Sequence, residues 1–411
     1  MPSVKGKRSE ARKYFSLMDT PWKSSVILAP MSKGSNLPFR RLCCEFGAET
    51  TVSEMIFASA LAKRNRKDLA LLRRHPSEKC FGVQILTNSP DDLNDAVPII
   101  EESGADFIDL NCGCPIDEAV SKGMGANLLD RTRRLENILE RLEALCHIPF
   151  TVKLRSGYKE GHTNIAETAK MAENHRAAGL VVHGRTREQR YTGVADWNAV
   201  RTAVETVSIP VVGNGDILTW YEAEDRLKLS GACGVMIGRG ALIKPWIFQE
   251  IRDKKDLNPS ARERIAVYLR LTEYMLEHFG SDAHGRRTSA SFMAWHFDLL
   301  TRWRFLPREE WYGASLEHPL IQTRLNGVYE GDPLDIVLAG YGKRLRLQLA
   351  DLFIEGAAEK RPQNWLEEKI SALAPEIVAD HERRLAEKAA KKEAKAAQES
   401  LSSSGLPFCE P

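Results

Sequence analysis

The chain has 411 residues, 43% of them hydrophobic, and a formal net charge of only +2. This length is enough to bury the core of one barrel of about 250 residues and to build a second unit. The small net charge excludes a strongly basic protein that binds nucleic acid through its overall charge, so RNA contact would need local basic faces.

Residues 1–25 form a basic segment with few apolar side chains. We expect a solvated N-terminal arm here, with contact to RNA as the alternative. No signal-peptide core follows Met1, and no apolar run has the length of a membrane span. The eight cysteines do not follow a secreted disulfide pattern. We therefore expect reduced thiols, no membrane partner and a cytoplasmic location, with the nucleus as an alternative.

Short apolar runs rich in β-branched residues recur through the first part of the chain. The eight runs start at Val26, Thr50, Phe81, Phe107, Phe150, Gly179, Ile209 and Gly234. Helix-type segments such as 90–102, 133–145, 165–178 and 220–229 fill the gaps between runs. This alternation predicts an α/β fold, a closed parallel (β/α)8 TIM barrel over residues 26–255.

Polar residues cluster where these runs end, which in a parallel barrel is the catalytic face. Along the first six ends lie Pro30 and Met31, Glu54, Gln84, Asn111, Lys153 and Arg155, and His183 and Arg185. Ordinary solvated caps would be scattered over both faces of the barrel, so this convergence favours a ligand site. Val152 and Leu154 bracket Lys153, which favours an inward-facing lysine over a surface one.

Glycines follow the seventh and eighth runs, in Gly213-Asn214-Gly215-Asp216 and Gly238-Arg239-Gly240. Glycine lets backbone N–H groups approach a phosphate, and Arg239 adds positive charge. Asn-Gly alone is an ordinary turn signal, but two glycine-rich ends at these positions are more specific. No G-x-G-x-x-G motif opens the chain, so we expect a mononucleotide cofactor, and FMN is the redox member of that class.

The run from Phe107 ends in Asn111-Cys112-Gly113-Cys114-Pro115, where proline blocks a helix and the backbone has to turn. This places a thiol on a loop at the catalytic face. A cysteine with an ordinary pKa is mostly protonated at neutral pH, which suits a proton donor. We predict no metal site, because the cysteine pairs lack C-x-x-C spacing and nearby histidines.

Residues 256–370 combine large apolar residues at helical spacing with many arginines. We interpret the stripe of Met275, Phe279, Phe292, Trp295, Leu299 and Trp303 as the core of an all-helical domain, with base stacking as the alternative. The candidates for phosphate contacts are Arg286, Arg287, Arg302, Arg304, Arg308, Arg324, Lys343, Arg344 and Arg346. Residues 371–411, rich in Ala, Lys and Glu, are expected to form a solvated helix that frays into disorder.

The ordered motifs of residues 26–255 resemble the flavin-dependent tRNA-dihydrouridine synthases. The matches include L-A-P-M from Leu28, N-L-P-F-R-R-L-C from Asn36, G-V-Q-I from Gly82, I-D-L-N-C-G-C-P from Ile108, T-V-K-L-R from Thr151, H-G-R-T from His183, G-N-G-D-I from Gly213 and M-I-G-R-G-A-L from Met236. The R-E-Q-R-Y run from Arg187 is most similar to the eukaryotic branch that modifies tRNA position 47. That branch often carries zinc fingers before the barrel, whereas no cysteine precedes Cys43 here.

The resemblance implies reduction of a uridine in tRNA, at position 47 first, with mRNA as a further candidate substrate. FMN would carry hydride from NADPH or NADH, and Cys114 would protonate C5, with Cys112 serving in packing. With the strand ends described above, we expect cofactor contacts at Pro30, Met31, Gln84, Lys153, His183, Asn214, Gly215, Asp216, Gly238 and Arg239. Substrate contacts are expected at Asn111, Arg155 and Arg185.

Three alternatives stay open at this point. The chain could act on another tRNA position, or it could be a different FMN barrel oxidoreductase that reduces a free pyrimidine or an enone. Activity on free uridine but not on tRNA would favour the latter. An RNA-binding or tRNA-folding protein that keeps the barrel without turnover would instead be colourless and would gain no FMN on reconstitution.

Overall fold

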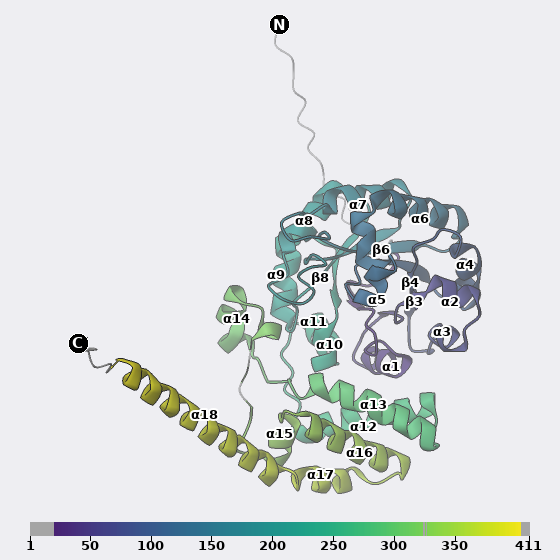
Figure 1. Cartoon of the computed structure of the whole chain (residues 1–411). Helices are drawn as coiled ribbons and strands as arrows, with labels where there is room; N and C mark the ends of the chain where they lie inside the picture. The colour runs from purple at the N-terminus through teal and green to yellow at the C-terminus, as the bar shows by residue number, and fades with distance from the viewer. Residues whose placement is uncertain (1–19, 324, 326, 404–411) are drawn as a thin grey trace, which may run out of the picture. The chain divides into compact units, whose positions relative to one another are not determined.

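The computed structural model describes residues 20–323, 325 and 327–403. The chain divides into two compact units, one of Met1–Asn258 with Phe305–Arg324 and the other of Pro259–Arg304 with Leu325–Pro411 (Figure 1). The expected boundaries, 26–255 for the barrel and 256–370 for the helical domain, did not include a return of the chain to the first unit. Most of the expected N-terminal arm lies outside the described residues.

The first unit is built on a parallel sheet that closes into a barrel, as predicted. Its strands are β1 (Val26–Leu28), β2 (Thr50–Val52), β3 (Ile56–Phe57), β4 (Cys80–Leu86), β5 (Phe107–Cys112), β6 (Phe150–Arg155), β7 (Gly179–His183), β8 (Val211–Asn214) and β9 (Gly234–Ile237). The order is β2-β1-β9-β8-β7-β6-β5-β4-β3, and an additional pairing of β2 with β4 closes the ring. The two-residue strand β3, which we did not expect, pairs with the end of β4.

Helices surround this ring in the order of the chain (Figure 1). They are α1 (Leu37–Glu45), α2 (Ala58–Ala62), α3 (Arg66–Ala70), α4 (Leu93–Glu102), α5 (Asp117–Ser121), η2 (Gly125–Asp130), α6 (Thr132–Leu145), α7 (Ile165–Asn174), α8 (Trp197–Thr206), α9 (Trp220–Ser230), α10 (Arg239–Ile243) and α11 (Ile247–Asp253). Apolar residues at helical spacing form the buried faces, as in α6 with Leu135, Ile138, Leu139 and Leu142.

The residues that lead into β1 belong to the barrel core. Trp22 is only 1% exposed and packs with Ile27, Val181 and Val212 in one buried cluster. Gly179 makes room for it, since a Cβ at this position would lie 2.6 Å from the Trp22 ring. The last residues of the expected solvated arm are therefore anchored to the barrel through an indole.

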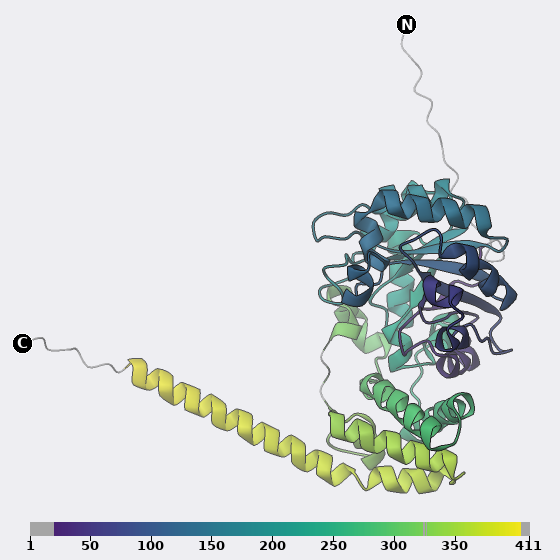
Figure 2. The same cartoon turned by 45° about the vertical axis from the view of Figure 1, so that its right-hand side comes forward.

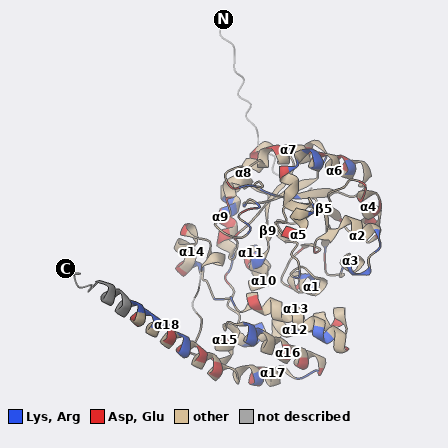
Figure 3. Cartoon of the chain, in the orientation of Figure 1, with Lys and Arg blue, Asp and Glu red and all other residues tan. Residues whose placement is uncertain are grey.

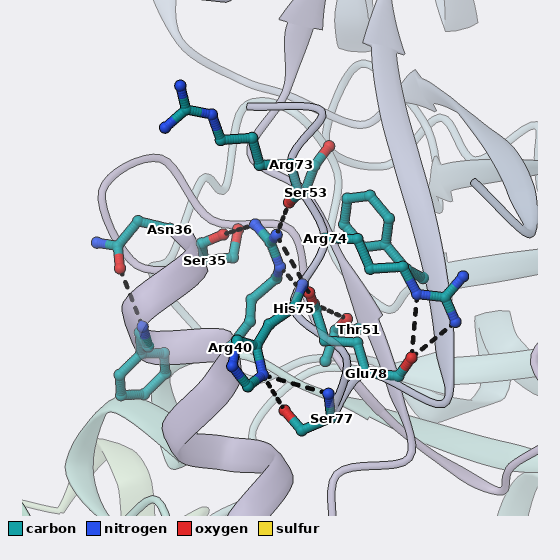
Figure 4. A network of polar contacts seen from close by, with 12 residues as sticks. Ser35, Asn36, Arg40, Thr51, Ser53, Arg73, Arg74, His75, Ser77 and Glu78 are labelled. Atoms are coloured by element: carbon teal, nitrogen blue, oxygen red, sulfur yellow. Dashed lines mark hydrogen bonds and ion pairs between the residues drawn. The ribbon is translucent and has the colours of Figure 1, made fainter. Parts of the chain in front are cut away.

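A buried ion pair fixes helix α1 to the loop that precedes β4 (Figure 4). Arg40 Nε lies 2.7 Å from Glu78 Oε1, and both side chains are almost wholly buried. Glu78 also accepts hydrogen bonds from Thr51 Oγ1 (2.5 Å) and from the His75 N–H (2.7 Å). Arg40 in turn donates to the carbonyls of Ser35 and Arg73. Because every charge in this network has partners, the N-L-P-F-R-R motif has a clear structural role.

The segment Phe305–Arg324 belongs to the barrel unit and carries α14 (Arg308–Glu317) and η3 (Leu320–Gln322). It is held on α9, where the Leu320 N–H donates to the buried carboxylate of Glu222 at 2.9 Å. The Tyr221 hydroxyl donates to the Leu306 carbonyl at 3.3 Å. Arg308, a candidate for phosphate contacts, lies in the barrel unit and not in the helical one, where its exposed side chain lies over the rings of Trp220 and Tyr312.

The second unit is all-helical, as predicted. It contains α12 (Ala261–Phe279), α13 (Ala283–Leu300), α15 (Pro333–Leu338), α16 (Lys343–Ala358), α17 (Gln363–Ser371) and α18 (Ala374–Ser403). Of the apolar stripe, Met275, Leu299 and Trp303 are buried, whereas Phe279, Phe292 and Trp295 are half-buried. Phe297, absent from the expected stripe, packs centrally against Tyr268 and Phe353. None of the described helices has the length and apolarity that a membrane crossing requires.

Helix α18 follows α17 in the chain and is a separate, long helix (Figure 2). Basic and acidic side chains alternate along it, with Arg383 and Arg384 paired to Asp380 (Figure 3). The helix expected from residue 371 onward is present as α18, and its residues 382–395 are exposed. The disorder expected at its far end falls on residues outside the described part of the chain.

Candidate active site

The parallel register brings the predicted polar residues together at the carboxyl ends of adjacent strands. Asn111 of β5 pairs with Lys153 of β6, Arg155 of β6 pairs with His183 of β7, and His183 pairs with Asn214 of β8. Most of these side chains are buried although they are polar. Burying a polar group lowers the stability of the fold unless the group has hydrogen-bond partners. The buried polar residues at this end of the barrel therefore indicate a ligand site.

Asn111 organises the loop that carries the candidate proton donor. Its Oδ1 accepts hydrogen bonds from the backbone N–H groups of Gly113 (3.0 Å) and Cys114 (2.8 Å). Its Nδ2 donates to Gln84 Oε1 at 2.8 Å. The two amides predicted to contact substrate and cofactor are therefore directly linked, and the backbone of Cys114 is tied to them.

The two cysteines of this loop differ in their surroundings. Cys112 is fully buried in β5, whereas Cys114 is half-buried and packs against a small cluster that includes Leu86, Ala119 and Met124. Burial raises the pKa of the Cys114 thiol, although Arg155 and Lys153 act in the opposite direction. Cys114 is therefore a protonated thiol at neutral pH, in the state that a proton donor requires.

Lys153 is a half-buried cation inside the barrel mouth. Its Nζ lies 3.1 Å from Asn214 Oδ1, and Asn214 Nδ2 in turn donates to the Met236 carbonyl at 2.8 Å. Burial lowers the pKa of Lys153 to about 8, partly offset by attraction to Asp109. A lysine with this pKa carries most of its positive charge at neutral pH and loses it just above that range.

The depressed pKa of Lys153 predicts a pH-dependent stability difference. The folded lysine loses its proton near pH 8, whereas the unfolded lysine keeps it until its ordinary pKa of 10.5. Unfolding therefore takes up a proton in this range, so the wild-type protein should gain stability relative to Lys153→Met as pH rises from 8 to 10.5, and lose it as pH falls through 8. Urea unfolding of both proteins at pH 7, 8.5 and 10 measures the difference. A difference that does not change with pH would contradict the assigned environment of Lys153.

Arg155 holds two loops of the site together. Its Nε donates to the Gly113 carbonyl at 2.7 Å, and its Nη1 donates to the carbonyls of Thr186 (2.8 Å) and Arg190 (3.0 Å). Burial lowers its pKa to about 10, which still leaves the guanidinium charged at neutral pH. Arg155 therefore positions the loop of Cys114 against the loop that follows β7.

Asp216, just after β8, accepts bonds from two of the predicted arginines. Its Oδ2 lies 2.6 Å from Arg185 Nη2, and its Oδ1 lies 3.0 Å from Arg239 Nη2. Gln322 Nε2, on the segment that returns to the barrel unit, also donates to Asp216 at 2.8 Å. Gln322 was not predicted, because nothing local in the sequence shows that residue 322 comes back to the end of β8.

His183 is kept neutral by its neighbours. Arg185 Nη1 lies 3.2 Å from His183 Nε2, and because a guanidinium can only donate, this ring nitrogen has to accept. Burial and the surrounding cations, Arg155 first, lower the pKa of His183 well below its ordinary value. His183 thus offers a neutral imidazole at the site rather than a positive charge.

Tyr191 is a site residue that the sequence reasoning missed. It is 56% exposed, and its ring lies 5.0 Å from the Arg239 guanidinium and 5.8 Å from that of Arg155. It also lies beside the His183 ring, at 6.5 Å between centroids. The R-E-Q-R-Y run contained the signal, since it places an aromatic residue beside basic ones in the loop after a barrel strand.

Of the two glycine-rich strand ends, the one at Gly238 has room for a ligand, whereas the one at Gly215 is crowded. A Cβ on Gly238 would meet nothing closer than Met31 Sδ at 3.6 Å, whereas a Cβ on Gly215 would lie 2.6 Å from Ala195. The Met31 N–H already donates to Ser35 Oγ at 2.8 Å. Met31 therefore offers its side chain to the site, since its backbone N–H is already bonded within its own loop.

The residues at the barrel mouth fit FMN. The barrel end combines a cation at Lys153, buried amides at Gln84 and Asn214, and a half-buried Arg239 beside the open Gly238. This is the set of groups that a ring with polar edges and a phosphate requires. Among the described residues, no group of three or more His, Cys, Asp or Glu side chains is arranged to hold a metal ion.

The fold and the site define a parallel β/α barrel protein with a buried polar mouth suited to a phosphate-bearing cofactor. The chain belongs to the dihydrouridine synthase (Dus) family, whose model matches residues 27–321. This match covers the barrel and nearly all of the segment that returns to it.

Curated relatives carry the same family name. The chain is 36% identical over 361 residues to tRNA-dihydrouridine(47) synthase [NAD(P)(+)] of Coprinopsis cinerea, covering 84% of this chain and 52% of the relative. It is 41% identical to the enzyme of that name from Cryptococcus neoformans, over 66% of this chain and 40% of the relative. For the human tRNA-dihydrouridine(47) synthase [NAD(P)(+)]-like protein the identity is 38%, over 68% and 43%. The chain thus spans about half the length of the curated relatives it matches.

Proposed function

We propose that this chain is a tRNA-dihydrouridine synthase that reduces the C5–C6 double bond of a uridine in tRNA, with position 47 as the first candidate. FMN is the proposed cofactor, and NADPH or NADH the proposed reductant. Family membership and the names of the relatives support the reaction and the position. The observation that carries the proposal is a protonated thiol at Cys114, held by Asn111 at the mouth of the barrel.

Bound FMN would supply the hydride that is added to C6 of the uracil. The thiol of Cys114 would donate the proton that C5 receives, which completes the reduction of the double bond. Arg155 and Lys153 favour the thiolate that is left, since both lower the pKa of Cys114, and solvent then restores the thiol. Asn111 supports the step by fixing the backbone of the donor.

The other predicted residues are assigned as parts of this site. We assign Gln84, Lys153, His183, Asn214, Gly238 and Arg239 to cofactor binding, and Asn111, Arg155 and Arg185 to the substrate side. The cofactor contacts expected at Pro30, Met31, Gly215 and Asp216 stay predictions. Arg185 is fully buried against Asp216, so it would act on substrate by shaping the loop at Gly193, to whose carbonyl it donates at 2.6 Å.

The tRNA would be held by the barrel rim and the helical unit, since a uridine within a folded RNA has to leave its stack to reach the site. On the helical unit, Arg286, Arg287 and Lys343 are exposed at the starts of α13 and α16. Exposed cations are suited to phosphate contacts, which supply most of the affinity for RNA. The proposed compartment is the cytoplasm or the nucleus, and mRNA is a further proposed substrate.

The proposal is tested by mapping dihydrouridine in the RNA of cells that lack this protein. We expect loss at one tRNA position, 47 first, with recovery when the wild-type chain is supplied again. Sites in mRNA are read from the same map. An unchanged map would contradict the proposed function, and loss at another position would correct the assigned site.

A further inference from the structure

A buried carboxylate lies beneath the site and has no role in the steps described so far. Asp109, in the middle of β5, is 1% exposed. Its Oδ1 accepts a hydrogen bond from Thr151 Oγ1 at 2.7 Å, and its Oδ2 accepts one from Gln84 Nε2 at 2.7 Å. Burial raises its pKa to about 6, so the carboxylate is ionised at neutral pH, where both oxygens can only accept.

The hydrogen bonds from the Cys114 loop to Asp109 form a relay with a fixed direction. The N–H groups of Gly113 and Cys114 can only donate, so Asn111 has to turn its oxygen toward the loop. Its nitrogen then faces the oxygen of Gln84, at 2.8 Å, which leaves the Gln84 nitrogen facing Asp109. Backbone donors at one end and a pure acceptor at the other thus determine the orientation of both amides.

We propose that Asp109 is a positioning residue that fixes the orientation of Gln84 and Asn111 and thereby holds the loop of Cys114 in place. Without this acceptor the Gln84 amide can turn over and present its nitrogen to the nitrogen of Asn111. Asn111 then either loses its hydrogen bond to Gln84, or turns its own nitrogen toward the N–H groups of Gly113 and Cys114 and loses those two bonds. The effect of the relay on catalysis rests on the proposed function. Its effect on the position of the Cys114 loop does not.

Asp109 also interacts electrostatically with Lys153, separately from its role as the acceptor of the relay. Lys153, on the neighbouring strand β6, lowers the pKa of Asp109, and Asp109 in turn raises that of Lys153. Thr151 and Gln84 also lower the pKa of Asp109 through their hydrogen bonds. The charge of Asp109 therefore favours the cation at the barrel mouth, whereas the relay to Cys114 needs only its acceptor oxygen.

Three substitutions separate the relay from simple packing. Asp109→Leu removes the acceptor, whereas Asp109→Asn can keep the relay, because its oxygen can accept from Gln84 while its nitrogen donates to the hydroxyl of Thr151. Thr151→Val is the matched control, since it removes the other hydrogen bond of Asp109 and leaves the bond to Gln84 in place. The full chain is used as purified, without RNA or reductant.

Two measurements report on the loop: hydrogen–deuterium exchange of the peptide spanning residues 107–116, and the rate at which iodoacetamide alkylates Cys114. In Asp109→Leu we expect the amides of Gly113 and Cys114 to exchange about tenfold faster, the equivalent of one hydrogen bond, and alkylation to accelerate with them. Asp109→Asn and Thr151→Val should remain close to wild type.

Gln84→Met breaks the relay one link closer to the loop and leaves Asp109 in place, so it carries the test if Asp109→Leu folds poorly. Wild-type exchange in both Asp109→Leu and Gln84→Met would overturn the proposal. Equal acceleration in Thr151→Val, or no rescue by Asp109→Asn, would also overturn it. A chain with no synthase activity could still show the relay in these measurements, so failure of the proposed function is distinguishable from failure of this inference.

Discussion

Replacing Cys114 with alanine should lower the rate of dihydrouridine formation by about 10² to 10⁴, the range that a positioned general acid contributes. The backbone N–H of Cys114 is bonded to Asn111, which holds the residue in place. The raised pKa of the Cys114 thiol keeps it protonated at neutral pH. Alanine keeps the loop backbone and its hydrogen bonds but has no proton to give. Single-turnover reduction of a tRNA substrate by the purified protein measures the loss.

Cys112→Ala is the matched control, because it removes a thiol two residues away that is fully buried in β5. It should cost stability through the small cavity that it leaves, but the rate of reduction should remain within a few-fold of wild type. The flavin absorbance of both variants shows whether the cofactor site is intact. Comparable loss of rate in the two variants, or full activity of Cys114→Ala, would exclude the assigned proton donor.

Replacing Arg40 with methionine should destabilise the folded protein by about 3–5 kcal/mol, the cost of leaving a buried charge without its partner. Arg40 bonds with Glu78 and with the carbonyls of Ser35 and Arg73, so its loss leaves a carboxylate and two carbonyls buried with fewer partners. Methionine approximates the shape of the arginine stem, which keeps the packing term small. Urea unfolding at neutral pH gives the difference.

Lys79 provides the comparison, because its ion pair with Glu49 is adjacent in sequence but largely exposed. An exposed pair contributes about 0–1 kcal/mol, so Lys79→Ala should have little effect. Adding Glu78→Gln to Arg40→Met should restore part of the loss, since the unpaired charge is then absent. If Arg40→Met cost no more than Lys79→Ala, the buried network would not be a main support of α1.

The barrel and most of its mouth could be predicted because the determinants are local. Each apolar run is a strand, and Asn111, Lys153 and His183 at the strand ends reach the same face because the strands are parallel. Asp109 could have been found by the same logic, since alternation along β5 places it on the same side as Asn111 and Phe107. Its position between Ile108 and Leu110, however, makes it hard to distinguish from a member of an apolar run.

The residues that could not be predicted depend on the path of the chain over longer distances. Gln322 reaches Asp216 only because the segment after the first two helices of the second unit returns to the barrel. Tyr191 lies in a loop without periodic pattern, so its place beside Arg155 and Arg239 depends on the fold of that loop. The buried ring of Trp22 likewise depends on space left by Gly179, far away in the sequence.

The return of Phe305–Arg324 to the barrel unit affects how this protein can be dissected. The chain leaves the barrel unit after Asn258, re-enters it at Phe305 and leaves again after Arg324. A truncation at Asn258 would take away the N–H partner of Glu222 and the amide that contacts Asp216. Excision or exchange of the helical unit therefore has to preserve two separate junctions, because the barrel unit is not contiguous in the sequence.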